Sequence, residues 1–340
     1  NRRMHKLSLT VIVAMMFLAC SIIIISGQDS SEADSGTCGD NLTWTLENET
    51  LTISGTGPMR DFTDLSRPTW NNWNRSITNV VIEEGVTSIG SKAFFKNDSI
   101  LTVRLPESLT SIGTEAFYQC DSIFEVLNYS NLPITKGSSD YGGIARYAKN
   151  VVWSVDDLSI NVLDGKFMYG SSGTDYYLVR YVGSESSVTL PSTINGKGYE
   201  IYKYAFYGNK TVSSVVIPSG VTAIGDYAFS GCSSLSSIDL PGSITTIGRS
   251  AFSGCGLVSL AIPEGVTTIT KGIFSGCSAL TTISLSVIIP RICPLSSQTG
   301  IEPTSAWRIC LATWAIDVSG RTQTIEVDIK SFTFINCLLT

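Results

Sequence analysis

The stretch Val221–Cys232, VTAIGDYAFSGC, is followed at Ile244–Cys255 by ITTIGRSAFSGC, a second copy of the same pattern. Six phenylalanines mark six such copies along the chain: Phe94, Phe117, Phe206, Phe229, Phe252 and Phe274. Consecutive copies are 23 residues apart, or 22 between the last two, with one long gap after Phe117. A repeat of this length predicts a solenoid, in which each coil buries its apolar face only by stacking on its neighbours.

Each position of the repeat has its own composition. A branched apolar residue, usually followed by proline, stands twelve residues before the phenylalanine, and predicts a short strand that ends where proline offers no N–H. The Val-Thr-x-Ile-Gly piece predicts a second extended segment. Its glycine permits a tight turn, and the Ala-Phe pair then begins a helical or 3₁₀ turn whose ring fills the coil. The glycines of this column are Gly90, Gly113, Gly225 and Gly248.

Three residues after the phenylalanine, asparagine and cysteine replace one another. The column consists of Asn97, Cys120, Asn209, Cys232, Cys255 and Cys277. Both residue types are small and have a polar tip that can bond the turn backbone, so its cysteines are expected to be buried free thiols. The other cysteines of the exported part lie outside the repeats and are available for disulfides, whose connectivity the sequence leaves open: Cys38, Cys293, Cys310 and Cys337.

The pattern resembles the leucine-rich repeat L-x-x-L-x-L-x-x-N/C-x-L, in the 23-residue variant of the BspA-like family. The resemblance covers roughly Ile77–Leu127 and Val188–Leu285, and departs from the pattern at Thr270 and Ile273. It implies a surface protein of mucosal or gut microbes or of protozoa. It also implies adhesion to host matrix proteins or to other cells.

The fold class expected is a leucine-rich-repeat solenoid, mainly β with short helical or 3₁₀ turns. A β-hairpin caps its N-terminus, with strands at Leu42–Leu46 and Thr50–Ser54, and a β-rich island interrupts the repeats. That island is either one insertion or a cap followed by a new hairpin. The expected divisions are a signal peptide or anchor (1–27), a linker (28–37), the cap (38–76), repeats (77–127), the inserted β-rich island (128–187), repeats (188–285) and a divergent segment (286–340).

The divergent segment 286–340 has two explanations. It is either a C-terminal cap or the product of a reading-frame slip, because its composition differs abruptly from that of the repeats. At the other end, Arg2, Arg3 and Lys6 precede an apolar run at residues 7–25. This is the layout of a cleaved secretory signal, and the run is also long enough for a membrane anchor. Both alternatives place the rest of the chain outside the cytoplasm, with membrane contact only through residues 7–25 if they are retained.

No constellation for catalysis stands out. The single histidine is His5, which excludes Ser-His-Asp, Cys-His and histidine-based metal sites from the exported part. No phosphate-binding glycine loop is present, and no cofactor is expected. Acidic pairs such as Glu83-Glu84 and Asp156-Asp157 are interpreted as solvated turn residues. A net charge of −6 without a basic run argues against nucleic acid as a partner.

We therefore expect a non-enzymatic protein that binds an extracellular protein ligand, either a matrix or a cell-surface protein. Glycan binding through aromatic residues such as Trp70 and Trp73 is one alternative, and an architectural surface role is the other. Tyrosine is favoured at interfaces, so the candidate contact residues come from the island: Tyr141, Tyr176, Tyr177 and Tyr181. The candidate N-glycosylation sites are Asn41, Asn48, Asn74 and Asn128. Two further sequons, Asn97 and Asn209, stand in the inward column.

Overall fold

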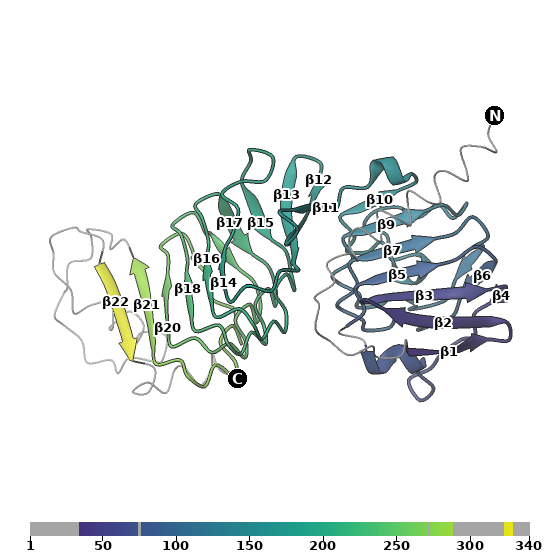
Figure 1. Ribbon diagram of the computed structural model, residues 1–340, viewed down its shortest axis with the longest axis horizontal. Coiled ribbons are helices and arrows are strands. Elements are labelled where there is room, and N and C mark those ends of the chain that lie inside the picture. The colour runs from purple at the N-terminus through teal and green to yellow at the C-terminus, as the bar shows by residue number, and fades with distance from the viewer. Residues whose placement is uncertain (1–33, 74–75, 271, 288–322, 329–340) are drawn as a thin grey trace, which may run out of the picture. The chain divides into compact units, whose positions relative to one another are not determined.

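The structure is a computed structural model that describes residues 34–73, 76–270, 272–287 and 323–328 (Figure 1). The chain divides into two compact units, with the boundary between Gly165 and Lys166. We call them unit 1 and unit 2. Each is a β-solenoid with short turns, as the repeats predict. The expected signal or anchor at residues 1–27 lies outside the described residues.

Unit 1 has two ladders of stacked strands. The larger begins with antiparallel strands and continues in parallel; its order is β1 (Asp34–Gly39), β2 (Leu42–Glu47), β3 (Thr50–Gly55), β5 (Asn79–Ile82), β7 (Thr102–Leu105), β9 (Glu125–Asn128) and β10 (Asn150–Val152). The smaller is parallel and holds β4 (Gly57–Pro58), β6 (Val86–Ile89) and β8 (Ser111–Ile112). The other elements of unit 1 are the 3₁₀ helices η1 (Thr69–Trp73), η2 (Tyr141–Gly143) and η3 (Val155–Asp157), and β11 (Asn161–Leu163).

In unit 2 a hairpin again starts a ladder, but on the Val-Thr-x-Ile side of the coils (Figure 1). This ladder contains β12 (Phe167–Ser172), β13 (Asp175–Tyr181), β15 (Tyr199–Ile201), β17 (Val221–Ile224) and β19 (Thr246–Ile247). On the other side of the coils, the strands that precede proline are β14 (Ser187–Thr189), β16 (Ser214–Val216), β18 (Ser237–Asp239) and, further along the array, β20 (Ser259–Ile262). Strand β21 (Thr282–Val287) pairs with β20 in the same way but has no proline at the equivalent position. Strand β22 (Gln323–Asp328), within the divergent segment, pairs antiparallel with β21.

Stacked rings form the centre of each unit. In unit 1, Phe94 and Phe117 lie 4.7 Å apart between ring centroids, with planes 18° apart. In unit 2, Phe229 lies between Phe206 at 4.8 Å and Phe252 at 5.6 Å. The same inward position therefore recurs from coil to coil, as the period of the sequence predicts.

The cysteines of the Asn/Cys column are buried free thiols, as expected. Each thiol donates to the carbonyl oxygen of the phenylalanine one coil earlier: Cys120 to Phe94, Cys232 to Phe206, Cys255 to Phe229 and Cys277 to Phe252, with Sγ–O distances of 2.9–3.0 Å. Asparagine acts differently, because Asn209 Oδ1 accepts from the backbone N–H groups of its own turn, at Thr211 and Val212. Both residue types thus satisfy backbone hydrogen-bonding groups of the turns.

The column glycines have a different role from the one expected. Their φ angles are not in the left-handed region; a Cβ on Gly113 would lie 2.4 Å from Ser91 N, and one on Gly225 2.6 Å from Lys203 N. These glycines allow neighbouring coils to approach closely. The left-handed turn residues stand two positions before and two positions after the phenylalanine. At the second of these positions unit 2 has glycines such as Gly231 (φ 76°), whereas unit 1 has residues such as Gln119 (φ 59°).

A hairpin and the side chain of Trp70 cover the first coil of unit 1 and act as its cap. The hairpin predicted within the cap is strands β2 and β3, and the side chain of Trp70 stacks on Phe94 with 5.8 Å between centroids. Residues 34–37, assigned to the linker from sequence, instead belong to β1 and pair with β2. The alternation that revealed the hairpin does not extend to this glycine- and serine-containing strand.

The β-rich stretch at residues 128–187 contains two structures. Strand β10 pairs in parallel with β9, and Ile144, Ala145 and Ala148 are buried in the core of unit 1, so the stretch begins with another coil. Its second half forms the β12–β13 hairpin, and β13 pairs in parallel with the first repeat strand of unit 2. This corresponds to the alternative of an array that ends and a hairpin that opens the next one.

Candidate functional site

Aromatic and charged side chains gather on the turns of unit 1 that precede and follow the buried phenylalanines. We call this set the turn surface; it consists of Asp64, Arg67, Lys92, Phe95, Lys96, Glu115, Tyr118, Gln119, Tyr141, Arg146 and Tyr147. Contacts between successive coils and two small clefts join these residues into one strip. The repeat places them together because equivalent positions of neighbouring coils lie side by side.

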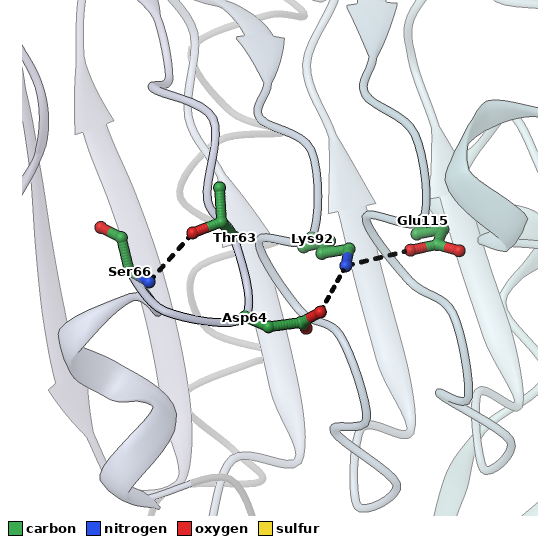
Figure 2. Close-up of polar contacts among 5 residues, drawn as sticks. All are labelled: Thr63, Asp64, Ser66, Lys92 and Glu115. Atoms are coloured by element: carbon green, nitrogen blue, oxygen red, sulfur yellow. Dashed lines mark hydrogen bonds and ion pairs between the residues drawn. The ribbon is translucent and has the colours of Figure 1, made fainter.

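A lysine bridges the coils at one end of the strip. Figure 2 shows Lys92 between two carboxylates, with its Nζ 3.1 Å from Asp64 Oδ2 and 3.5 Å from Glu115 Oε2. The hydrogen bond to Asp64 raises the pKa of Lys92, so the ammonium stays charged. Ser66 N donates to Thr63 Oγ1 in the loop that carries Asp64. The pairs are solvent-exposed and fix side-chain positions more than they add stability.

Exposed rings continue the strip. Phe95 and Tyr118, each directly after a buried phenylalanine, stack with 5.5 Å between centroids and 16° between planes. The ammonium groups of Lys92 and Lys96 lie 5.2 Å and 5.1 Å from the centroid of Phe95, within range of a cation–π interaction. The side chain of Tyr118 is 39% exposed. The outer part of this stack is therefore available to another molecule.

Beyond Tyr118 the surface is hollowed into a cleft of about 380 Å³. Its walls include Tyr118, Tyr141, Arg146 and Tyr147, and its floor includes the backbone at Gly142. The Arg146 guanidinium lies 5.3 Å from the centroid of Tyr147, which is 44% exposed. The volume lies at the lower end of the range for ligand-binding clefts, about 300–1,000 Å³.

Unit 2 has a related stack that ends differently. Tyr204 and Tyr227, each two residues before a buried phenylalanine, stack at 5.0 Å with planes 13° apart. The guanidinium of Arg249, from the following coil, lies 5.2 Å above Tyr227. A side chain of the protein itself therefore covers the end of this stack.

The four candidate contact tyrosines have different environments. Tyr141 lines the cleft, and Tyr176 is half-buried with Lys197 Nζ 6.0 Å from its ring centroid. Tyr177 and Tyr181 are each only 5% exposed, which leaves little surface for a ligand. Tyr181 stacks on Phe206 and starts the ring column of unit 2. Strand β13 therefore caps the first repeat coil of unit 2. The sequence did not indicate this role, because β13 lies in the gap between the repeats.

The candidate glycosylation sites also differ in their exposure to solvent. Asn41 and Asn48 are exposed on the N-terminal hairpin, and Asn74 lies outside the described residues. Asn128 is wrong as a site in the folded protein, because it is fully buried and its Nδ2 donates to Leu132 O at 2.9 Å. Of the inward-column sequons, Asn97 is fully buried and Asn209 is half-buried.

The acidic pairs lie apart from the turn surface. Both oxygens of Glu84 accept backbone N–H groups of the next coil, from Glu107 at 2.9 Å and Ser108 at 3.2 Å. Asp156 and Asp157 are exposed in η3. Within the described ranges, no group of three or more His, Cys, Asp or Glu side chains is arranged to hold a metal ion.

Among the residues that the structure describes, one carboxylate is buried. Glu125 is 2% exposed and accepts from Ser159 N at 3.0 Å and Ser159 Oγ at 2.8 Å. Burial raises the pKa of Glu125 despite these bonds. The contact ties the segment after η3 to strand β9.

Most of the turn surface was not predicted from the sequence. No role was assigned to the position after the buried phenylalanine, although Phe95 and Tyr118 occupy it in consecutive copies. Two aromatic residues at equivalent positions of neighbouring coils must stack, and that spacing was the available signal. Arg146 and Tyr147 carried no such signal because their coil lacks the repeat pattern.

Matches to the BspA type leucine-rich repeat region occur in six copies, at residues 66–138 and 199–293. The chain is a BspA-type leucine-rich repeat protein. The two matched regions correspond to the two sets of repeats, and the resemblance seen in the sequence is confirmed. No curated protein matches the chain.

Several solved leucine-rich repeat structures are similar to this BspA-type chain. A leucine-rich repeat protein from Eubacterium ventriosum is 22% identical over 74% of this chain and 78% of its own, with a TM-score of 0.38. A leucine-rich cell surface protein from Faecalibacterium prausnitzii is 22% identical over 76% and 89%, with a TM-score of 0.38. The pneumococcal vaccine antigen PcpA is 17% identical over 74% and 81%, with a TM-score of 0.39.

No helix in the described part of this BspA-type protein has both the length and the apolar character needed to cross a membrane.

Proposed function

We propose that this BspA-type protein is a non-enzymatic protein of the cell surface that binds a protein ligand through the turn surface of unit 1. The observation that carries the proposal is the strip of stacked, partly exposed rings flanked by Lys92, Lys96 and Arg146. Aromatic residues and arginine are the side chains most enriched at interfaces and among their energetic centres. The basic and apolar N-terminal pattern supports export, and adhesion to matrix or to other cells is the role proposed for binding.

The test uses purified full-length protein, immobilised matrix proteins and a glycan array. We expect saturable binding to at least one protein. We also expect its loss in the variant Phe95→Ser/Tyr118→Ser/Tyr147→Ser, which removes the exposed rings of unit 1. The matched control Tyr204→Ser/Tyr207→Ser/Tyr227→Ser removes rings from unit 2 and should leave binding unchanged.

Two outcomes contradict the proposal. Equal loss in both triple variants would move binding away from the turn surface. Binding to glycans alone, abolished by the unit 1 variant, would make the protein a lectin instead. Circular dichroism and thermal melting of each variant establish that it is folded, which is expected because the substituted rings are partly exposed.

A further inference from the structure

The exposed ring stack of unit 1 stops after two coils. Phe95 and Tyr118 stack on one another, and two lysines cover the Phe95 end. In a regular coil after Tyr118 the equivalent residue would lie at the same height, because every coil repeats the geometry of the last. This coil places no side chain there, and the reason lies in the local backbone.

Hydrogen bonds identify which residues take the equivalent positions in that coil. Phe117 N donates to Gly142 O at 2.9 Å, as Phe94 N donates to Ala116 O at 2.7 Å one coil earlier. Gly142 therefore corresponds to Ala116, and the next residue, Gly143, corresponds to Phe117. A Cβ on Gly142 would lie 2.8 Å from the Cβ of Ala116, and its φ is 66°. Only glycine fits this turn.

The position equivalent to Tyr118 is then Ile144, which is 1% exposed and packs into the core of unit 1. No side chain of this coil stacks on Tyr118 from that position. The result is the cleft of about 380 Å³ between Tyr118 and the residues Tyr141, Arg146 and Tyr147. The cleft thus occupies the place of one ring in a periodic stack.

The charges around the cleft favour a negatively charged partner. Glu115, on its wall, is engaged by Lys92 at 3.5 Å. Arg146 forms no ion pair with any residue that the structure describes. The turn surface holds four cationic side chains, Arg67, Lys92, Lys96 and Arg146, against two carboxylates, Asp64 and Glu115, which both pair with Lys92. It is therefore locally cationic on a chain whose net charge is −6. A negatively charged partner is therefore attracted to this part of the molecule in particular.

We propose that the cleft binds an aromatic side chain of an acidic protein segment. The ring stacks on Tyr118 and continues the series begun by Phe95, and a carboxylate on a neighbouring residue pairs with the Arg146 guanidinium. A peptide carries both groups on adjacent residues. A neutral glycan makes no use of the cationic surroundings. The inference rests on the proposed function and names the chemistry of its ligand.

The experiment uses full-length protein and three capped pentapeptides. The first is Glu-Asp-Tyr-Asp-Glu, the second replaces its tyrosine by serine, and the third is the uncharged Gln-Asn-Tyr-Asn-Gln. Saturation-transfer NMR at low ionic strength follows weak binding and identifies the ligand protons in contact. We expect saturable binding of the first peptide, the largest transfer to its ring protons, and at least about fivefold weaker binding of the other two.

Variants locate the contact. Tyr118→Ser should weaken binding of the first peptide about tenfold. Arg146→Gln should weaken binding of the first, acidic peptide about tenfold and have little effect on binding of the third, uncharged peptide. The matched control is Tyr227→Ser, which removes a half-buried stacked ring from unit 2 and should leave binding unchanged.

Three results would overturn the inference. They are equal binding of the serine peptide, unchanged affinity in Tyr118→Ser, and displacement of the peptide by neutral oligosaccharides. The outcome is separable from that of the proposed function. If the first peptide fails to bind while the protein still binds a matrix protein through its turn surface, the ligand chemistry is wrong and the function stands. If the triple ring variants of the two units behave alike, the function fails as well.

Discussion

The exposed ring stacks of the two units end in different ways. In unit 2 the Arg249 guanidinium covers Tyr227, whereas in unit 1 Tyr118 faces a cleft. Both stacks arise because equivalent positions of neighbouring coils lie about 5 Å apart. The difference comes from the following coil, which is a regular repeat in unit 2 and a glycine turn at Gly142 in unit 1. A periodic fold acquires a distinct surface where its period fails.

The turns themselves differ as well. Two residues after the buried phenylalanine, unit 2 has glycine at each left-handed position, such as Gly231, while unit 1 has Lys96 and Gln119 there. A residue with a Cβ is strained in the left-handed region. Unit 1 therefore carries side chains of the turn surface at positions where unit 2 has the conformationally preferred residue.

The largest expected effect tests whether the two units are energetically separate. Phe229→Ala removes a ring that stacks at 4.8 and 5.6 Å on its neighbours, and should lower the unfolding free energy of unit 2 by about 3–5 kcal/mol. Hydrogen exchange followed by mass spectrometry should show faster exchange in unit 2 peptides only. Phe117→Ala is the mirror variant for unit 1. Equal loss of protection in both units would mean that they unfold together.

A pH experiment sharpens the comparison of the thiol columns. Burial raises the pKa of Cys232 from its ordinary 9.0 to about 12, and also raises that of Cys255 and Cys277. The folded state therefore favours the protonated thiol, and this stabilisation is present below pH 9 and is lost as pH rises through the folded pKa. Each column thiol should steepen the loss of unfolding free energy above pH 9 by about 1 kcal/mol per pH unit.

The control for this effect replaces the three column thiols of unit 2 by serine. Urea titrations at pH 8 and pH 10, under reducing conditions, should show a smaller pH dependence in Cys232→Ser/Cys255→Ser/Cys277→Ser than in the unmodified protein. Cys120→Ser in unit 1 should reduce the pH dependence of the unfolding free energy by about one third of the reduction that the triple variant shows. An identical pH dependence in all three proteins would show that the thiols ionise as easily when folded as when unfolded.

Reciprocal substitutions test the cost of the turns. Gly231→Ala should lower the unfolding free energy of unit 2 by about 1–2 kcal/mol through backbone strain alone, because its new Cβ would lie 3.4 Å from the nearest atom and meet no severe clash. Gln119→Gly should stabilise unit 1 by up to about 1 kcal/mol. Thermal and urea unfolding measure both changes. If Gln119→Gly destabilises the protein, the left-handed turn of unit 1 is not strained.

The smallest effect concerns the bridge drawn in Figure 2. Lys92→Met removes contacts to Asp64 and Glu115 and should change stability little, because exposed ion pairs are screened by solvent and salt. Urea titrations at low and high ionic strength should give nearly the same result for the variant and the unmodified protein. A large, salt-dependent destabilisation would give Lys92 a structural importance that its exposure argues against.

Much of the fold follows from the repeat columns. The ring column, the two strands per coil and the buried thiols were predicted from residues such as Phe229 and Cys232, since a fixed period places each residue type in a fixed environment. The cap hairpin was equally visible from alternation between Leu42 and Ser54. The role assigned to the glycine column was wrong, because the sequence shows that glycine is required and not whether a turn or a neighbouring coil requires it.

The candidate site was much less predictable. Tyr181 was expected on the surface because nothing in the sequence shows that a hairpin strand must supply the first ring of the unit 2 core. The cleft depends on Gly142 taking the place of Ala116, a correspondence that only the hydrogen bond from Phe117 reveals. Where the period is lost, spacing no longer predicts position, and the cleft forms at such a place.

The thiol-to-carbonyl contacts have a consequence for how such a gene can change. Because Cys255 bonds Phe229 as Cys232 bonds Phe206, and the copies are 23 residues apart, removal of one period of codons joins two coils that fit each other equally well. Unequal recombination between neighbouring repeats would lengthen or shorten the array in whole coils without disturbing its interior. The glycine coil around Gly142 has no equivalent elsewhere in the described chain, so the same event there would erase the cleft.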